Sequence, residues 1–291
     1  MKPTPFRYER AESAEHAVAL LAEHGDDAKI LAGGQSLVPM IALHLAQPAV
    51  LVDINRVPGL ADVTAESGVI SIGALTRHRE VEESELLQRE QPVFAAAGSN
   101  VGHYPIRVRG TFGGSLAHAD PASEWCAVAL LLDAEVDVLG PGGRRSIPVD
   151  SLFDGFLTTT VRDDELLLGA RLRRGRRAAF TELSRRRGDF ALVLAGVAVE
   201  EGPDGSVTAA RVVLGGVDAS VVRSPDAEEA LVGSPLSTRS ASLAGEAAAA
   251  AVDPPSDVHA AGWYRRQLVQ VLVRRCAESL VPVDAAGPPA R

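Results

Sequence analysis

Residues 29–37, KILAGGQSL, decide how the first part of this chain is interpreted. A short apolar run ends at the pair Gly33 and Gly34, and a glutamine and a serine then lead into a helical pattern. Adjacent glycines permit positive φ angles and carry no Cβ atoms, so the backbone there can approach a ligand closely. The N–H groups of such a turn, together with the start of a helix, can hold an anion such as a phosphate.

A second glycine-rich stretch, RGTFGGSLAHADP at residues 109–121, shares a feature with the first. Each holds a glycine pair followed by a hydroxyl side chain and a leucine, as GGQSL at 33–37 and GGSL at 113–116. Asp120 is expected to cap a new helix that has Pro121 at its first position. Two such loops on different subdomains would close on one diphosphate from both sides. A large dinucleotide such as FAD would suit them, with its ring between domains.

Two known nucleotide-binding fingerprints fail at the first stretch. The order of strand, glycine turn, helix and strand, followed by Asp53, has the outline of a Rossmann unit. However, the motif G-x-G-x-x-G counted from Gly33 requires glycines where Gln35 and Val38 stand. A Walker A loop also fails, because no G-K-[ST] follows the glycines. The glycine turn is therefore still expected to hold a phosphate, although it matches neither fingerprint.

The composition is that of an ordinary soluble protein. A length of 291 residues predicts two or three domains. The net charge of −9 argues against a nucleic-acid or anionic-membrane surface over the chain as a whole. The sequence contains neither a secretory signal nor an apolar run long enough to cross a membrane, so the cytoplasm is the expected compartment.

Metal and hydrolase chemistry have little support. The two cysteines, Cys126 and Cys276, are too few for a four-thiolate iron–sulfur cluster or a zinc ribbon, and both are expected to be buried in helices. The seven histidines show neither H-x-x-x-H nor H-E-x-x-H spacing, so no metal site is expected. Ser36 and Ser115 do not lie in a G-x-S-x-G elbow, which leaves a serine hydrolase without support.

The chain divides into three expected domains and a tail. Residues 1–55 predict a compact α/β unit with the first glycine stretch, and residues 56–175 a second unit with the other. Residues 176–281 run as strands and then helices, which suggests a separate α+β domain. Residues 282–291 are typical of a disordered tail.

AGGQSL at 32–37 together with TFGGSLAHADPASE at 111–124 resembles the FAD-binding medium (flavoprotein) subunit of the molybdenum hydroxylases. This is the xanthine dehydrogenase and carbon monoxide dehydrogenase family, and the resemblance runs from about residue 2 to residue 280. It implies an α+β fold. Two FAD-binding subdomains of the vanillyl-alcohol-oxidase/PCMH type would be followed by a C-terminal antiparallel sheet with helices.

The resemblance also implies a set of FAD contacts. The first stretch would wrap the pyrophosphate, with Ser36 as a hydroxyl donor, and the second would form the facing wall. Asp120 would meet a polar part of the cofactor, and Phe190, after a Gly-Asp pair, would pack beside the flavin ring. The complete set is Lys29, Leu31, Ala32, Gly33, Gly34, Gln35, Ser36, Leu37, Val101, Gly110, Thr111, Gly113, Gly114, Ser115, Asp120, Leu167 and Phe190.

The chain departs from the family pattern at several positions. Phe112 replaces the usual isoleucine and should be tolerated, whereas Val108 replaces an asparagine. Glu182 stands near a position where the family often has a lysine, which puts a cationic contact to the cofactor in doubt. Carbon monoxide dehydrogenases tend to have a histidine where Gln35 stands, which argues against carbon monoxide as the substrate.

The function implied by the resemblance is electron transfer in a heterotrimeric molybdenum hydroxylase. A large molybdopterin subunit would oxidise the substrate, and a small subunit would hold [2Fe–2S] clusters. Electrons would reach FAD in this chain and then NAD⁺, a quinone or oxygen. No catalytic residue is expected here. Two alternatives stay open: a stand-alone FAD-dependent oxidoreductase of the same fold, and a binding module that has lost FAD.

Overall fold

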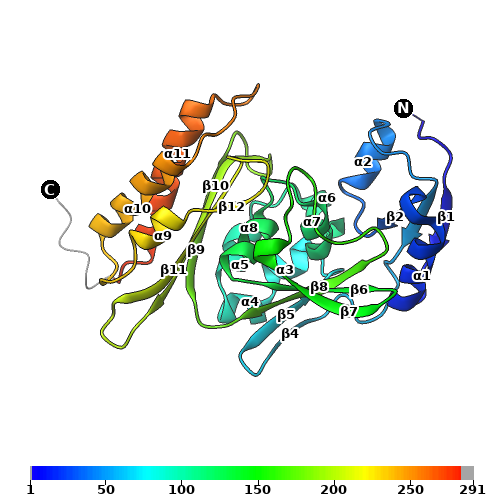
Figure 1. Ribbon diagram of the computed structural model, residues 1–291, viewed down its shortest axis with the longest axis horizontal. Coiled ribbons are helices and arrows are strands. Elements are labelled where there is room, and N and C mark those ends of the chain that lie inside the picture. The colour runs from blue at the N-terminus through cyan, green and yellow to red at the C-terminus, as the bar shows by residue number, and fades with distance from the viewer. Residues whose placement is uncertain (1, 283–291) are drawn as a thin grey trace.

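The computed structural model describes residues 2–282, and its strands form three sheets that follow one another along the molecule (Figure 1). Helices lie between and beside the sheets, and two of the three apolar core clusters join residues of neighbouring sheets. The expected tail lies outside the described residues, apart from Pro282. We keep the boundaries 1–55, 56–175 and 176–281 as proposed domain limits.

The first sheet is small and parallel, and it carries the first glycine stretch. Its strands in spatial order are β1 (Arg7–Arg10), β3 (Val50–Asp53) and β2 (Ala28–Leu31). The helices beside it are α1 (Ala14–His24) and α2 (Leu37–Ala42). Ser13 caps α1, because its hydroxyl accepts a hydrogen bond from the His16 amide at 3.1 Å. The glycine stretch therefore links the end of β2 to the start of α2.

The second sheet has five strands, and all its pairings are antiparallel. In spatial order the strands are β4 (Val63–Glu66), β5 (Val69–Gly73), β8 (Leu166–Arg173), β6 (Glu135–Gly140) and β7 (Gly143–Pro148). The helices of this part are α3 (His78–Glu83), α4 (Glu85–Glu90), α5 (Val93–Gly98), α6 (Tyr104–Arg109), α7 (Phe112–His118) and α8 (Glu124–Leu131). Figure 1 shows that α5 and α8 lie between this sheet and the third sheet.

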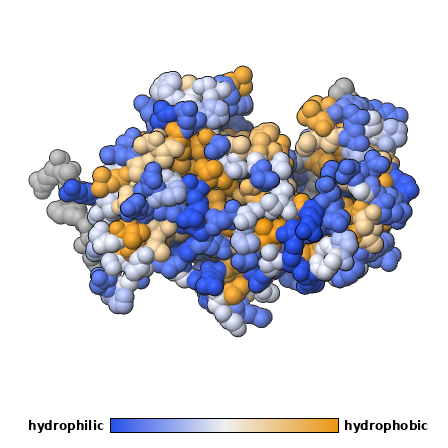
Figure 2. Space-filling view, viewed as in Figure 1, coloured by the Kyte–Doolittle hydropathy of each residue, from blue (hydrophilic) through white to orange (hydrophobic). Residues whose placement is uncertain are grey.

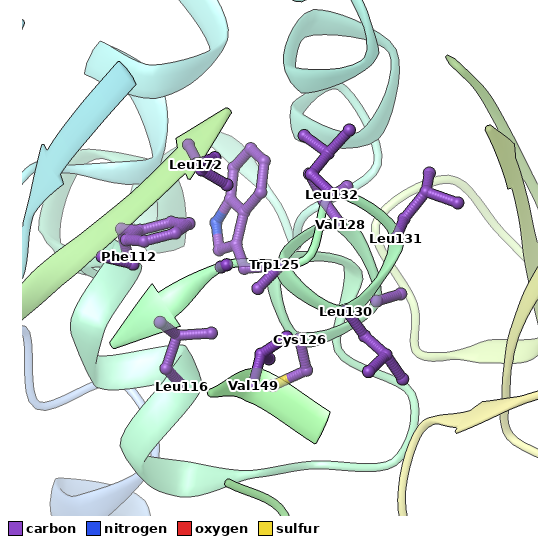
Figure 3. Close-up of a cluster of buried hydrophobic side chains, with 14 of the residues drawn as sticks. Phe112, Leu116, Trp125, Cys126, Val128, Leu130, Leu131, Leu132, Val149 and Leu172 are labelled. Carbon is purple, nitrogen blue, oxygen red and sulfur yellow. The ribbon is translucent and has the colours of Figure 1, made fainter. Parts of the chain in front are cut away.

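The core of the central part is built around aromatic side chains. Trp125, Phe94 and Phe112 are fully buried, and the ring centroids of Phe112 and Trp125 lie 6.0 Å apart. In the close-up, Phe112 and Leu116 of α7 extend toward Trp125 (Figure 3). The departure from isoleucine at position 112 is thus accommodated in the apolar core, where a larger ring gains contact area.

The third sheet is a four-stranded antiparallel sheet with helices on one face. Its strands in spatial order are β12 (Val222–Arg223), β11 (Val207–Gly215), β10 (Ala191–Glu201) and β9 (Arg177–Ser184). The helices are α9 (Pro225–Glu229), α10 (Thr238–Ala251) and α11 (Gly262–Ser279). Alternate residues of β10 pack on opposite sides: Leu194 joins the central core, whereas Val193 joins the core under α11. Burial on both faces explains the nearly continuous apolar run of this strand.

Two details differ from the sequence-based expectations. The second glycine stretch was expected to be a loop, but most of it forms α7, whose N-terminus is capped by Thr111. Asp120 was expected to cap the following helix; instead Ser123 caps α8, and Asp120 accepts a hydrogen bond from the Ala122 amide at 2.8 Å. The helix starts later because the Asp-Pro segment forms a turn before it.

Both cysteines lie in helices and are buried, as expected. Cys126 belongs to α8 and Cys276 to α11, and neither forms a disulfide. Burial raises the pKa of each thiol to about 12. None of the helices within residues 2–282 has the length and apolar character needed to cross a membrane.

Candidate functional site

The two glycine stretches are in direct contact. A Cβ atom built on Gly33 would lie 2.4 Å from the carbonyl oxygen of Arg109 and 2.7 Å from the Cα atom of Gly110. Both neighbours are backbone atoms, so no side-chain rotation could relieve the clash. Only glycine permits this approach. The close contact joins the loop after β2 to the end of α6.

In the first stretch, several backbone N–H groups donate no hydrogen bond to any described residue. Gly34 has a φ of +71°, and Gln35 donates from its side-chain amide to the Gly33 carbonyl at 3.0 Å. Within residues 2–282, the backbone N–H groups of residues 33–36 have no hydrogen-bond acceptor. These amides are available to an anion, as the sequence predicts for this turn.

A cavity of about 370 Å³ opens over these amides. Its lining includes Ala32, Gly33, Gly34, Gln35, Asn55 and Arg109. The exposed guanidinium of Arg109 makes neither an ion pair nor a hydrogen bond with any residue of the described part of the chain. A positive charge beside free amides favours a negatively charged ligand. The residues therefore fit the pyrophosphate of a dinucleotide.

The second stretch has a different role, because its amides are already used. The Phe112 amide donates to the Thr76 carbonyl at 2.9 Å and the Gly113 amide to the Ala74 carbonyl at 3.0 Å. The Gly114 amide donates to the Thr111 hydroxyl at 3.1 Å. The second stretch thus forms a fixed wall beside the first, whereas the first supplies the free donors.

A larger cavity, of about 1320 Å³, lies where the central part meets the third sheet. It brings together two expected site residues from distant parts of the sequence, Asp120 and Phe190. Phe190 is 75% exposed at the start of β10, which is unusual for a large aromatic side chain. Arg185 and His103 also line this cavity. Figure 2 shows apolar residues at the surface near this junction.

Ten of the expected contacts line neither cavity: Lys29, Ser36, Leu37, Val101, Gly110, Thr111, Gly113, Gly114, Ser115 and Leu167. Val101 and Leu167 are buried in the central core and line neither cavity. Lys29 is exposed on β2, with its ammonium 4.0 Å from a carboxylate oxygen of Asp163. The expected contacts that line one of the two cavities are Leu31, Ala32, Gly33, Gly34, Gln35, Asp120 and Phe190. The part that each expected residue plays in binding stays a prediction.

Three residues beside the first cavity were not found from the sequence as site candidates. Asn55 and Arg109 line the cavity, and Arg77 donates to both of them. The available signal for Arg109 was a basic residue at the start of the second glycine stretch. Asn55 and Arg77 carry no such local signal, because their importance depends on contacts between distant segments.

Two acidic residues, Glu124 and Glu182, lie close enough for the charge of Glu182 to act on Glu124. Burial raises the pKa of Glu124 to about 8, and the negative charges of Glu182 and Asp120 act in the same direction. Burial raises the pKa of Glu182 to about 7, and its Oε2 atom has no hydrogen-bond partner among the described residues. The position where a lysine is frequent thus carries a carboxyl group that favours its neutral form.

Comparison with known proteins assigns the chain to a class. Residues 4–172 match the family described as the FAD binding domain in molybdopterin dehydrogenase, and residues 178–280 match the CO dehydrogenase flavoprotein C-terminal domain. The chain therefore belongs to the FAD-binding medium subunits of the molybdenum hydroxylases, the carbon monoxide dehydrogenase and xanthine dehydrogenase family.

Individual relatives and a solved structure agree with this assignment. The chain is 42% identical over 278 residues to the 6-hydroxypseudooxynicotine dehydrogenase complex subunit alpha of Paenarthrobacter nicotinovorans, covering 94% of each chain. It is 39% identical to the nicotine 6-hydroxylase medium subunit of the same organism, covering 94% of this chain and 97% of that one. Carbon monoxide dehydrogenase from Hydrogenophaga pseudoflava superposes with a TM-score of 0.92 at 34% identity, covering 96% and 98% of the two chains.

The comparisons confirm the expected fold and class. The chain has the medium-subunit fold, with an FAD-binding part and a C-terminal flavoprotein domain. It is an oxidoreductase subunit, as its dehydrogenase and hydroxylase relatives are. The solved relative from Hydrogenophaga pseudoflava is described as a carbon monoxide dehydrogenase that lacks the Mo-pyranopterin moiety of its molybdenum cofactor.

Proposed function

We propose that this chain binds FAD and carries electrons from the [2Fe–2S] clusters of a small partner subunit to NAD⁺ or another acceptor. The strongest support comes from the backbone amides of residues 33–36 and the neighbouring Arg109 guanidinium, none of which has a partner among residues 2–282. FAD supplies the redox chemistry when bound, because it can exchange electrons both singly and in pairs.

The protein's part in this function is binding and orientation. The amides of the first stretch and Arg109 would hold the pyrophosphate. Thr111, Gly113 and Ser115 line neither cavity, and their part would be to hold the backbone of Arg109 and Gly110 against Gly33. Asp120 and Phe190 would meet the flavin end in the larger cavity. No residue of the chain is assigned a proton-transfer step.

The proposed assembly contains a large molybdopterin subunit and the small iron–sulfur subunit. The support comes from the relatives: one is named as a subunit of a dehydrogenase complex and another as a medium subunit. We place the complex in the cytoplasm, where two unpaired cysteines such as Cys126 and Cys276 are ordinary.

The test is an electron-transfer experiment on the co-purified complex. The complex is reduced anaerobically with a limiting amount of dithionite, and NAD⁺, a soluble quinone or oxygen is then added. Return of the flavin absorbance with at least one acceptor is expected. Turnover of an organic substrate by this chain alone, without partners, would contradict the proposal and favour a stand-alone FAD-dependent oxidoreductase.

A further inference from the structure

A chain of hydrogen bonds joins the two glycine stretches through two side chains. Asn55, just after β3, donates from Nδ2 to the carbonyl oxygen of Ala32 at 2.9 Å. Its Oδ1 atom accepts a hydrogen bond from Nη2 of Arg77 at 2.8 Å. The other terminal nitrogen of Arg77, Nη1, donates to the carbonyl oxygen of Arg109. Arg77 and Asn55 together therefore connect the carbonyl groups of Ala32 and Arg109, which precede the two glycine motifs.

Further hydrogen bonds fix the positions of Arg77 and Asn55. The Arg77 backbone forms the N-cap of α3, and its amide donates to the carboxylate of Glu80 at 2.8 Å. The amide of the next residue, His78, donates to the Gly110 carbonyl at 3.0 Å. Asn55 is fixed by two hydrogen bonds of 2.7 Å to one carboxylate oxygen of Asp53, from its backbone amide and from Nδ2.

This arrangement fixes the direction of a free donor. A peptide unit is planar and trans, so its carbonyl and its N–H point in opposite directions. The hydrogen bond from Asn55 anchors the Ala32 carbonyl, and the Gly33 N–H of the same peptide unit must then point the other way. That N–H is one of those without an acceptor in the described chain. On the other side of Gly33, the Arg109 carbonyl is anchored by Arg77.

We propose that Arg77 and Asn55 are positioning residues that orient the Gly33 amide toward the pyrophosphate of the bound dinucleotide. The inference rests on the proposed function, because it assigns the free amides to that ligand. This role requires no contact with the ligand from either residue, although Asn55 also lines the smaller cavity. They act by holding the Ala32–Gly33 peptide unit and the Arg109 carbonyl against which Gly33 packs. Preorganised donors bind an anion more tightly than donors that must first be ordered.

The test compares FAD affinity with the stability of the cofactor-free chain. The full chain is stripped of flavin, and the dissociation constant for FAD is measured by quenching of flavin fluorescence. Arg77→Met and Asn55→Ala are each expected to weaken binding about tenfold, the usual effect of losing a hydrogen bond with a charged partner. Arg77→Lys is expected to recover little, because an ammonium group does not reproduce the two-nitrogen fork.

Arg79→Met is the matched control. Arg79 lies two residues further along the same helix, but its guanidinium pairs with Glu83 at 2.8 Å and lies over the ring of Tyr104. It touches neither glycine stretch, so this variant should bind FAD as the wild type does. The double variant of Arg77 and Asn55 should bind about as weakly as the worse single variant, because both changes break one network.

Several results would overturn the inference. One is an FAD affinity of Arg77→Met equal to that of Arg79→Met, even if the cofactor-free chain has lost stability. Another is a double variant whose loss is the product of the two single losses. If Arg77→Met does not fold, Asn55→Ala and Arg77→Lys decide in the same way. A wild-type chain that takes up no FAD would remove the proposed function itself, and this inference with it.

Discussion

At the scale of single residues, Gly33 carries the greatest constraint of the site. It packs against the backbone of Arg109 and Gly110, and it begins the run of amides that have no acceptor in the described chain. Its lack of a side chain therefore serves both the contact between the two stretches and the exposure of the donors. A glycine such as Gly142, which has open space around it, serves neither.

Gly33→Ala is expected to weaken FAD binding by at least 100-fold and to lower the melting temperature. The added methyl group would lie 2.4 Å from the Arg109 carbonyl oxygen, so the two backbone segments must separate. A loss of only about 1 kcal/mol would lower the melting temperature by roughly 2–4 °C in a chain of this size. Fluorescence titration and thermal unfolding measure the two effects. Gly142→Ala is the control, and equal behaviour of the two variants would contradict the expectation.

The sequence predicts residues of this kind well only when the signal is local. The glycine pair after an apolar run indicates the free amides of the first stretch without any knowledge of the rest of the fold. The bridge from Asn55 through Arg77 to the Arg109 carbonyl leaves no local trace. It depends on three segments that meet only after the chain has folded, and no spacing rule describes that meeting.

At the scale of elements, the packing of α8 against the third sheet buries an acidic pair. Glu124 is the first residue of α8, and Glu182 lies on β9. Burial raises the pKa of Glu124 to about 8 and that of Glu182 to about 7, from an ordinary value of 4.5. No described cation forms an ion pair with either carboxyl group. A lysine at position 182 would place a positive charge near Glu124 instead.

The raised pKa values of Glu124 and Glu182 predict that the free energy of unfolding falls as the pH rises through neutrality. In the folded chain Glu182 stays protonated up to about pH 7 and Glu124 up to about pH 8, whereas the unfolded chain ionises both above about pH 4.5. Their stabilising contribution is therefore complete below that pH and is lost as the pH passes through the folded-state values. Melting temperatures of Glu124→Gln and Glu182→Gln between pH 5 and pH 9 should depend less on pH than those of the wild type.

A substitution of Glu66, which is exposed on β4, is the control for the acidic pair. Glu66→Gln should leave the pH dependence of the melting temperature unchanged. Glu182→Lys should stabilise the chain most at high pH, where Glu124 is otherwise forced to ionise without a partner. If all these variants follow the wild-type pH profile, the pair does not control stability.

Element boundaries show where local sequence patterns are misleading. Glycines have a low helix propensity, so the second stretch favours a loop over the α7 that forms. That helix is stabilised by the Thr111 cap and by burial of Phe112 and Leu116, and only the second effect requires the folded core. In the C-terminal part the expected order of strands followed by helices is observed, because β10 and β11 are long apolar strands and α10 and α11 are long helices.

At the scale of the whole molecule, the three sheets in a row create two junctions (Figure 1). The smaller cavity contains residues of the first sheet's loops together with Arg109 of the central part. The larger cavity contains Asp120 of the central part together with Phe190 of the third sheet. We propose that FAD, which has an anionic centre and a flat aromatic end, extends from the smaller cavity into the larger one.

Phe190→Ala is expected to change the surroundings of the flavin ring without changing the groups that would hold the pyrophosphate. The amides that would hold the pyrophosphate are untouched, so FAD should still bind, with an affinity lower by about tenfold or less. The flavin absorption and fluorescence should change, because an exposed aromatic wall is lost. Phe6, which is 40% exposed and lines neither cavity, offers the control Phe6→Ala. A flavin spectrum identical to that of the wild type would place the ring elsewhere.

The most direct test of the account is the visible spectrum of the purified chain before and after addition of FAD. Flavin bands at about 370 and 450 nm are expected. These bands should stay with the protein through gel filtration at one FAD per chain and be missing in Gly33→Ala. A wild-type chain that retains no flavin, either alone or when purified together with its partner subunits, would contradict the central claim that the two glycine stretches form an FAD site.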